Sequence, residues 1–294
     1  MVNKSEITVI LNSYKRQKFL KYQINSLNKQ SLPYEKILIW NNGKSIEDAK
    51  FGKDVYIANS SYNFGVWARF AFALNSESKY ICMLDDDTMP GELFFENCID
   101  TINKNPSLLG TRGLRFLSSK YYEPYISFGW DNPNEKSEIV DIVGHAWFFK
   151  REWLTYFWRE MPLLDSSRFV GEDMHFSFML KKYAGIRTVV PPHPKNDLRL
   201  WGSDPSKAIQ IGTDNVSISQ NKESIRKFDK ALRHYTNNGI SLCKDEKYLK
   251  SKRYFVVPRT LRNPIFKKII LNIPFLEKIA RKFKNILLKK RIFF

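Results

Sequence analysis

Three consecutive carboxylates, Asp85, Asp86 and Asp87, directly follow the short apolar run at residues 80–84. The run is too short for a helix and is bounded by polar and Pro-Gly residues, so we expect a buried strand. A divalent cation would relieve the repulsion between the carboxylates, and their oxygens suit hard cations such as Mg²⁺ or Mn²⁺. Because side chains alternate along extended chain, Asp85 and Asp87 are expected to point the same way. A solvated acidic turn is the alternative.

A second carboxylate pair, Glu172 and Asp173, precedes the amphipathic stretch at residues 174–183. Acidic residues in the first turn of a helix are stabilised by the helix dipole, so simple capping explains the pair without any function. The functional interpretation is that one carboxylate faces the ligand crevice as a general base or an electrostatic partner.

The first 90 residues alternate between expected strands, at 7–11, 37–40, 55–58 and 80–84, and expected helices, at 19–27 and 66–74. This alternation indicates a parallel sheet with helices on both faces. Polar side chains gather where each strand ends. Open α/β sheets bind ligands at this end, so we expect a crevice that suits a nucleotide diphosphate.

The middle of the chain is less regular. We expect helices at 93–102, 153–158, 174–183 and 224–235, strands at 139–143 and 188–190, and loops at 121–130 and 196–220. The domain division that we expect is a catalytic domain at residues 1–255 and a basic amphipathic tail at residues 256–294.

The formal net charge of the 294 residues is +18, which predicts an anionic partner. Residues 258–294 contribute eleven Lys and Arg against Glu277 alone, with apolar residues at helical spacing. A basic helix with an apolar stripe is typical of binding to an anionic membrane surface, although such a stripe also packs on a protein partner. No apolar run approaches the roughly 20 residues that span a bilayer, and we expect no signal peptide. The three Cys residues lack metal-binding spacing and favour a reduced, cytoplasmic setting.

With these residues in view, the chain resembles a GT-A glycosyltransferase from residue 5 to about residue 235. The likeness is closest to the exostosin-like family, glycosyltransferase family 64, with family 2 as a relative. The segments that carry it are 12–16, 39–42, 83–88, 143–149 and 171–173. The resemblance implies an α/β fold with a Rossmann-like mixed sheet, helices on both faces, a UDP-sugar donor and an Mn²⁺ or Mg²⁺ ion.

The resemblance also implies roles for individual residues. Asp87 would bind the metal, with Asp85 beside it, and His193 would supply a further metal ligand. Asp173, or Glu172, would lie beside the anomeric carbon and the acceptor hydroxyl. The implied donor-binding residues are Ser13, Tyr14 and Arg16 at the uridine and its phosphates, Asn41 near the base, Asn63 and Arg69 at the ribose and pyrophosphate, and Asp85 and Asp86 at the ribose and donor sugar.

Two features depart from the family pattern, namely Trp147, where a small residue is expected beside the donor sugar, and the basic tail. Lys222 and Arg226 are candidates for the late basic residue near the pyrophosphate, and they match that pattern poorly. The likeness to family 64 favours a retaining reaction; an inverting, family 2-like reaction with Asp173 as base is the alternative.

The function that we expect is transfer of a hexose or N-acetylhexosamine from a UDP-sugar to a lipid-linked or cell-surface glycan, in bacterial polysaccharide biosynthesis. The enzyme would be cytoplasmic and peripheral on the inner face of the membrane. A nucleic-acid binder, a metal-dependent nuclease or phosphatase, and a sugar-binding protein without activity are the rival classes. No nucleic-acid-binding motif is present, so we expect no nucleic-acid partner.

Overall fold

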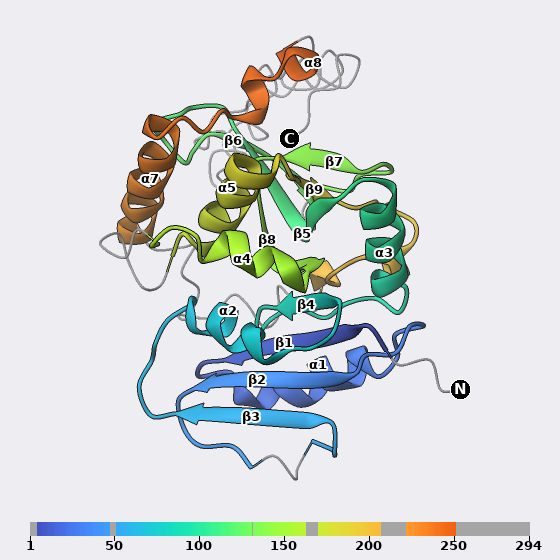
Figure 1. Ribbon diagram of the computed structural model, residues 1–294. Coiled ribbons are helices and arrows are strands. Elements are labelled where there is room, and N and C mark those ends of the chain that lie inside the picture. The colour runs from blue at the N-terminus through green and yellow to red at the C-terminus, as the bar shows by residue number, and fades with distance from the viewer. Residues whose placement is uncertain (1–4, 48–50, 131, 163–169, 207–221, 251–294) are drawn as a thin grey trace, which may run out of the picture.

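The computed structural model describes residues 5–47, 51–130, 132–162, 170–206 and 222–250. A single nine-stranded mixed sheet runs through these residues in the order β3-β2-β1-β4-β8-β5-β9-β7, and β6 pairs with β5 (Figure 1). The strands are β1 (Ile7–Ser13), β2 (Lys36–Asn42), β3 (Val55–Ser60), β4 (Tyr80–Leu84), β5 (Ser107–Phe116), β6 (Tyr125–Gly129), β7 (Glu138–Val140), β8 (Ile142–Lys150) and β9 (Arg187–Val190). The mixed α/β architecture confirms the predicted fold class.

The first half of the sheet is parallel. Strands β3, β2, β1 and β4 pair in parallel register, with Leu11 of β1 beside Leu84 of β4. The first four residues of β1 are buried, as expected for a central strand that is covered on both faces. The four predicted strands are confirmed, and α1 (Leu20–Leu27) and α2 (Ala68–Phe72) lie within the two predicted helices.

The second half of the sheet is largely antiparallel, because β8 runs antiparallel to both β4 and β5. Strand β5 was not predicted, and the prediction that residues 121–130 form a loop is wrong for β6. Gly110 and Gly113 weaken the strand pattern of β5. The fold needs both, because a Cβ at Gly110 would lie 2.4 Å from the Cβ of Val143 and one at Gly113 would lie 2.3 Å from a Val190 methyl.

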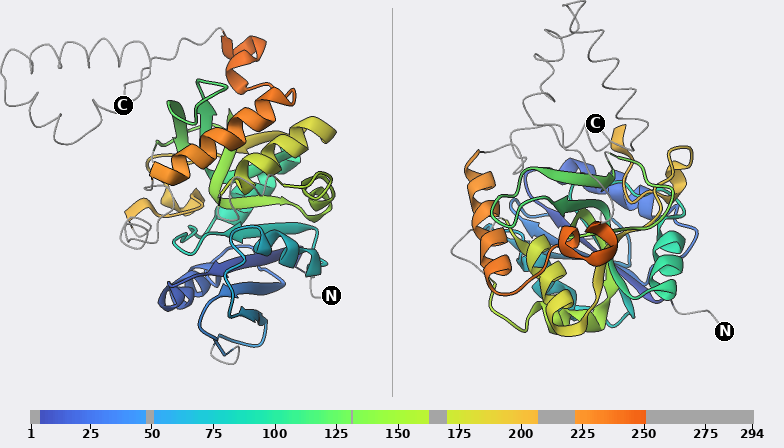
Figure 2. Two further views of the ribbon diagram at one scale, coloured as in Figure 1. Left: turned by 90° about the vertical axis from the view of Figure 1, so that its left-hand side faces the viewer. Right: turned by 90° about the horizontal axis from the view of Figure 1, so that it is seen from above.

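Helices α3 (Phe94–Lys104), α4 (Leu154–Phe157), α5 (Glu172–Ala184) and α7 (Lys222–Asn237) belong to the second half of the molecule (Figures 1 and 2). Helix α5 begins after Gly171 and ends at Gly185, and both glycines have positive φ. The left-handed Gly185 is a common way to end a helix. Helix α5 thereby presents Glu172 and Asp173 in its first turn.

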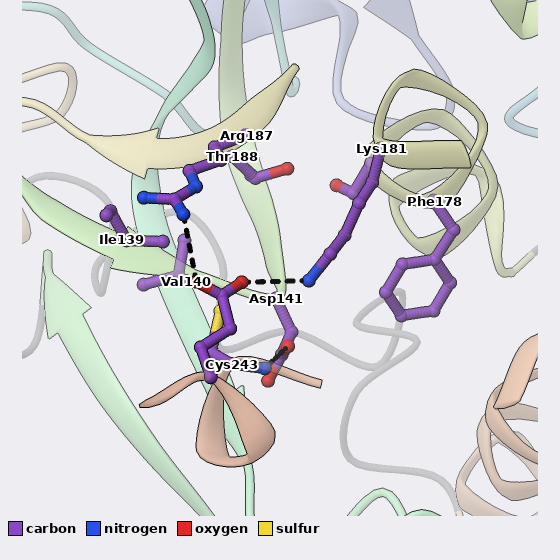
Figure 3. A pocket seen from close by; sticks show the side chains of 10 residues that line it. Ile139, Val140, Asp141, Phe178, Lys181, Arg187, Thr188 and Cys243 are labelled. Carbon is purple, nitrogen blue, oxygen red and sulfur yellow. Dashed lines mark hydrogen bonds and ion pairs between the residues drawn. The ribbon is translucent and has the colours of Figure 1, made fainter. Parts of the chain in front are cut away.

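Residues 240–250, the end of the last described segment, contact the sheet beside a small pocket (Figure 3). The buried Asp141 carboxylate accepts the backbone N–H groups of Cys243 and Phe116, each at 2.7 Å. Glu246 pairs with Lys181 at 3.0 Å and with Arg187 at 3.2 Å. Lys181 lies nine residues after Glu172 on α5, about 14 Å along the helix axis. The pocket is therefore separate from the first turn of α5.

The predicted tail at residues 256–294, the last residues of the predicted domain and most of the predicted loop at 196–220 lie outside the described residues. The domain division therefore stays a prediction. Within the described part of the chain, no helix is both long enough and apolar enough to cross a membrane.

Candidate metal and catalytic site

The candidate site lies at the carboxyl ends of β1 and β4. From β1 the chain order of the parallel strands proceeds through β2 to β3 on one side, whereas β4 lies on the other. Ligands of open α/β sheets bind in the crevice at such a switch point. The acidic segment Asp85 to Asp87 directly follows β4 and therefore lies at this switch point.

Asp85, Asp87 and His145 bring one ligand atom each within 4.8 Å of one another. Asp85 and Asp87 point the same way, as predicted, but the cause is a turn and not extended chain, since the Thr88 N–H donates to the Asp85 carbonyl oxygen at 3.1 Å. His145 Nδ1 lies 3.7 Å from Asp87 Oδ1, and both atoms are buried without a hydrogen-bond partner in the described structure. Two ligands that are each about 2.1 Å from one cation lie roughly 3 to 4 Å apart. These residues therefore fit a shared divalent cation; the two carboxylates suit Mg²⁺ or Mn²⁺, and the imidazole is a common ligand of transition metals.

A β-bulge aims His145 into the site. In the pairing of β5 with β8, Arg112 faces Gly144 and Gly110 faces Trp147, so two residues of β8 oppose Thr111 alone. His145 has a φ of 64°, a left-handed conformation that few non-glycine residues adopt. Bulges beside active sites commonly redirect a side chain in this way.

The backbone of His145 also fixes the acidic turn. Its carbonyl oxygen accepts the Asp85 N–H at 2.9 Å and the Thr88 hydroxyl at 2.8 Å. The side chain of Gln23, on α1, donates to the carbonyl oxygens of Asp85 and Thr88. One residue therefore supplies a candidate ligand and holds the turn that carries the other two.

Arg16 lies beneath the same turn. Its Nη1 lies 2.8 Å from Asp86 Oδ1 and 3.3 Å from Asp87 Oδ2. Burial would raise the pKa of Asp87, but His145 and Arg16 outweigh it and hold that pKa below its ordinary value. Burial raises the pKa of Asp86 to about 7 although Arg16 opposes this. Asp87 is therefore the carboxylate of this pair that is poised to bind a cation.

Arg69 connects three elements in the floor of the site. Its Nη1 donates to Asp85 and, at 2.8 Å, to Asn12 Oδ1, while its Nη2 donates to Glu172 Oε1 at 3.0 Å. The guanidinium lies 4.5 Å from the ring centroid of Trp147, and Arg69 is only 2% exposed. This placement corrects the prediction that Arg69 contacts the ribose and pyrophosphate, because the guanidinium is buried and engaged by protein oxygens.

The two carboxylates at the start of α5 have different surroundings. Glu172 is buried against Arg69, and burial raises its pKa to about 8, so its assignment as a possible base stays a prediction. Asp173 is half-buried, and its Oδ1 accepts the Met174 N–H at 2.7 Å. Burial raises the pKa of Asp173, and the nearby charge of Asp85 adds to this effect. A carboxylate with a raised pKa is suited to accept a proton at neutral pH, so Asp173 remains the candidate base.

Three other predicted donor-binding residues, Ser13, Tyr14 and Asn63, are buried or half-buried. Ser13 is buried at the end of β1 with no hydrogen-bond partner for its hydroxyl in the described structure, and Tyr14 is half-buried beside it. Asn63 is half-buried, and its side-chain oxygen accepts the Gly65 N–H at 2.9 Å. Their contacts with a donor stay predictions.

Asn41 has a structural role instead. It is fully buried, and its amide nitrogen donates to Asn59 Oδ1 and to the Lys44 carbonyl oxygen, both at 2.8 Å. Its side-chain oxygen accepts from Gln17 at 3.1 Å. One amide hydrogen joins Asn41 to β3 and the other joins it to the loop after β2, so both are used within the protein. A place near the base stays a prediction.

His193 does not take part in the candidate metal site. Its Nδ1 lies 2.8 Å from the Pro191 carbonyl oxygen, and its Nε2 lies 2.8 Å from Thr111 Oγ1 and accepts the Gly202 N–H at 3.2 Å. With both ring nitrogens engaged and the side chain fully buried, the prediction of a metal ligand is wrong. Arg226 is exposed on α7, and the side chain of Lys222 lies outside the described residues.

The sequence did not identify His145 as a ligand, and it suggested a place for Trp147 beside the donor sugar that the structure does not support. Trp147 is 2% exposed and packs under Arg69 and against Phe70, so it does not take the place of a small residue beside a sugar. His145 is 60 residues from Asp85, and the pairing of Ala146 with Leu84 brings the two together. Residues 143–149 contributed to the family resemblance, but nothing in that segment marked His145 as a ligand.

A family model described as glycosyl transferase family 2 matches residues 8–157, just over half of the chain. The match extends from β1 to α4 and includes all three residues of the candidate metal site. The comparison with curated proteins finds no match.

Solved structures of S. aureus TarS are similar in fold. The structure of its residues 1–349 is 16% identical, covers 83% of this chain and 74% of that chain, and has a TM-score of 0.47. The same portion in complex with UDP is 15% identical, with coverages of 87% and 76% and a TM-score of 0.46. The complex with UDP-GlcNAc is 14% identical, with coverages of 79% and 72% and a TM-score of 0.44.

Proposed function

The chain belongs to glycosyl transferase family 2 and is a GT-A glycosyltransferase, and we propose that it transfers a sugar from a UDP-sugar in a reaction that depends on a divalent cation. The observation that carries this proposal is the pair of unpartnered buried atoms, His145 Nδ1 and Asp87 Oδ1, that face each other beside Asp85. A hydrogen-bond donor or a cation is needed to satisfy them. Their place at the switch point of the sheet puts that cation where a donor diphosphate would bind.

Asp85, Asp87 and His145 would hold the cation, with Mn²⁺ or Mg²⁺ as the ions that we propose. When bound, such an ion neutralises charge that develops on the diphosphate as it leaves. Arg16 sets the charge state of the turn, since it pairs with Asp86 and Asp87 together. Arg69, which also pairs with Glu172, holds Asp85. The chain therefore fixes its metal ligands before the donor arrives, which is how enzymes limit reorganisation during reaction.

Asp173 is the base that we propose for the acceptor. Its carboxylate is half-buried in the first turn of α5, close enough to Tyr122 that its charge adds to burial in raising the pKa of the phenol. Deprotonation of an acceptor hydroxyl by Asp173 would let the oxygen attack the anomeric carbon opposite the leaving group. The preference for retention depended on the likeness to family 64. Membership of family 2 instead favours the inverting alternative, and we propose inversion.

The acceptor that we propose is a lipid-linked or cell-surface glycan, and the transferred sugar a hexose or N-acetylhexosamine. The support for this acceptor is the basic amphipathic pattern of residues 258–294, which suits an anionic membrane surface. A protein with this tail would work at the inner face of the membrane without spanning it. Deletion of the tail is expected to abolish binding to anionic vesicles, and unchanged vesicle binding would contradict this part of the proposal.

The function is tested by UDP release from a panel of UDP-sugars, with Mn²⁺ or with EDTA. We expect release that depends on Mn²⁺. In His145→Ala the Mn²⁺ concentration for half-maximal rate should rise at least about 100-fold, because loss of an outer partner of a ligand alone costs roughly 10- to 100-fold. His234→Ala, on α7, is the matched control and should behave as wild type. Turnover that is equally fast in EDTA would contradict the metal-dependent reaction.

A further inference from the structure

We propose that Trp130 is a positioning residue that holds the His145 imidazole in its metal-binding orientation. The two rings are stacked, with centroids 5.1 Å apart and planes inclined by 19°. Aromatic rings at this separation attract each other beyond the effect of burial alone. This inference depends on the proposed metal site, because the orientation matters only if Nδ1 binds a cation together with Asp87.

Such a contact orients the imidazole, because no residue in the described part of the chain holds its second nitrogen. A histidine that binds a metal usually donates its other ring N–H to a carboxylate or a carbonyl oxygen, which fixes the ring. Nδ1 of His145 faces Asp87. Among the residues that the structure describes, none forms a hydrogen bond with Nε2 of His145. Stacking on Trp130 therefore takes the place of the usual hydrogen bond.

Trp130 and His145 meet because of the register of three strands. Arg112 of β5 pairs with Gly129 of β6 and with Gly144 of β8. Trp130 and His145 are the residues that follow these two glycines. Trp130 and His145 therefore lie beside the same part of β5, Trp130 on the β6 side and His145 on the β8 side.

The backbone of Trp130 is held against β5. The backbone N–H of Trp130 donates to the Thr111 carbonyl oxygen at 2.9 Å. The indole Nε1 is buried with no hydrogen-bond partner in the described structure, and the Arg112 guanidinium lies 5.9 Å from the indole centroid. Gly129 has a φ of +85°, and a Cβ there would lie 2.0 Å from the Thr111 carbonyl oxygen. Only glycine allows the close approach that brings Trp130 over β5. Trp130 can therefore transmit the rigidity of the sheet to the imidazole.

The test measures Mn²⁺ affinity of the full chain by calorimetry, without donor or acceptor. Trp130→Leu removes the ring and should weaken Mn²⁺ binding roughly tenfold, at the lower end of losses for outer partners of a ligand. Trp130→Phe keeps an aromatic face and should bind within about twofold of wild type. Trp158→Leu is the matched control, because Trp158 is partly exposed and lies outside the site. His145→Ala gives the affinity without the imidazole.

The outcomes separate the two claims. Wild-type affinity in Trp130→Leu together with weakened binding in His145→Ala would overturn the role of Trp130 and leave the metal site intact. Wild-type affinity in His145→Ala would overturn the metal site and this inference with it. Weakening in Trp130→Leu that Trp130→Phe restores supports both.

Quenching of tryptophan fluorescence by Mn²⁺ provides a second readout that does not depend on the Leu variant being folded. Because quenching by this ion falls steeply with distance, the wild-type signal should come from Trp130 and from Trp147, whose ring lies 4.5 Å from the guanidinium that contacts Asp85. We expect Trp130→Phe to bind Mn²⁺ with the Trp130 share of that quenching lost. Equal quenching in wild type and Trp130→Phe would place the ion away from the indole and contradict the inference.

Discussion

Asp173→Asn is expected to lower kcat for sugar transfer about 1000-fold while UDP binding in the presence of Mn²⁺ stays unchanged. A general base typically contributes between about 100- and 10,000-fold. The amide of Asn occupies nearly the same volume and still accepts the Met174 N–H, so the first turn of α5 should remain in place. The measurement is steady-state transfer to an acceptor, paired with calorimetry of UDP binding.

Asp100→Asn, an exposed change of the same kind on α3, is the matched control for this effect. It should leave transfer unaltered. The product formed by the wild type should carry the anomeric configuration opposite to that of the donor, which NMR spectroscopy of the purified product shows directly. Transfer by Asp173→Asn within a few-fold of wild type, or a product with the donor's configuration, would exclude Asp173 as the base of an inverting reaction.

Arg69→Met is expected to cost about 3–5 kcal/mol in the free energy of unfolding, the usual cost of breaking a buried ion pair from one side. The substitution leaves Glu172 buried and Asp85 partly buried, both without their cation. Burial and the charge of Asp173 raise the pKa of Glu172. That pKa is about 8 in the wild type, where Arg69 opposes the rise, so it should be higher still in the variant. The loss relative to wild type should therefore grow as the pH rises through about 8 and above. Urea denaturation at several pH values measures it.

Two controls sharpen this experiment. Arg199→Met breaks an ion pair with Asp197 in which the Arg199 side chain is 61% exposed, and such surface pairs contribute at most about 1 kcal/mol. The double variant Arg69→Met with Glu172→Gln removes one of the two unpaired charges and should recover part of the loss. If Arg69→Met costs no more than Arg199→Met, the buried network does not stabilise the site as described.

The parallel half of the fold could be predicted because its signals are local. β1 and β4 are short apolar runs that end in polar residues, and their carboxyl ends meet at one edge of the sheet. The placement of Asp85 and Asp87 at a strand end follows from the sequence alone. The same reasoning identified Asp173 as a candidate base, since acidic residues precede an amphipathic helix there.

The other half depends on contacts that no local pattern shows. Gly110 and Gly113 weaken the strand pattern of β5, although tight packing against valines requires them. His145 reaches Asp87 only through the β4–β8 pairing and a bulge, and a histidine between prolines at 193 was the more obvious candidate. Asn41 and Arg69 were placed at the crevice but assigned ligand contacts, because the sequence does not show that other protein atoms already engage them.

Calorimetric titration of UDP with and without Mn²⁺ tests most directly whether the cation site binds the donor diphosphate. Wild-type protein should bind UDP only when Mn²⁺ is present. Asp87→Ala should lose this binding while remaining folded, because it removes the carboxylate that faces His145. UDP binding that is independent of Mn²⁺, or that survives in Asp87→Ala, would contradict the account. Failure of folded wild-type protein to bind UDP at all would remove UDP as the donor nucleotide.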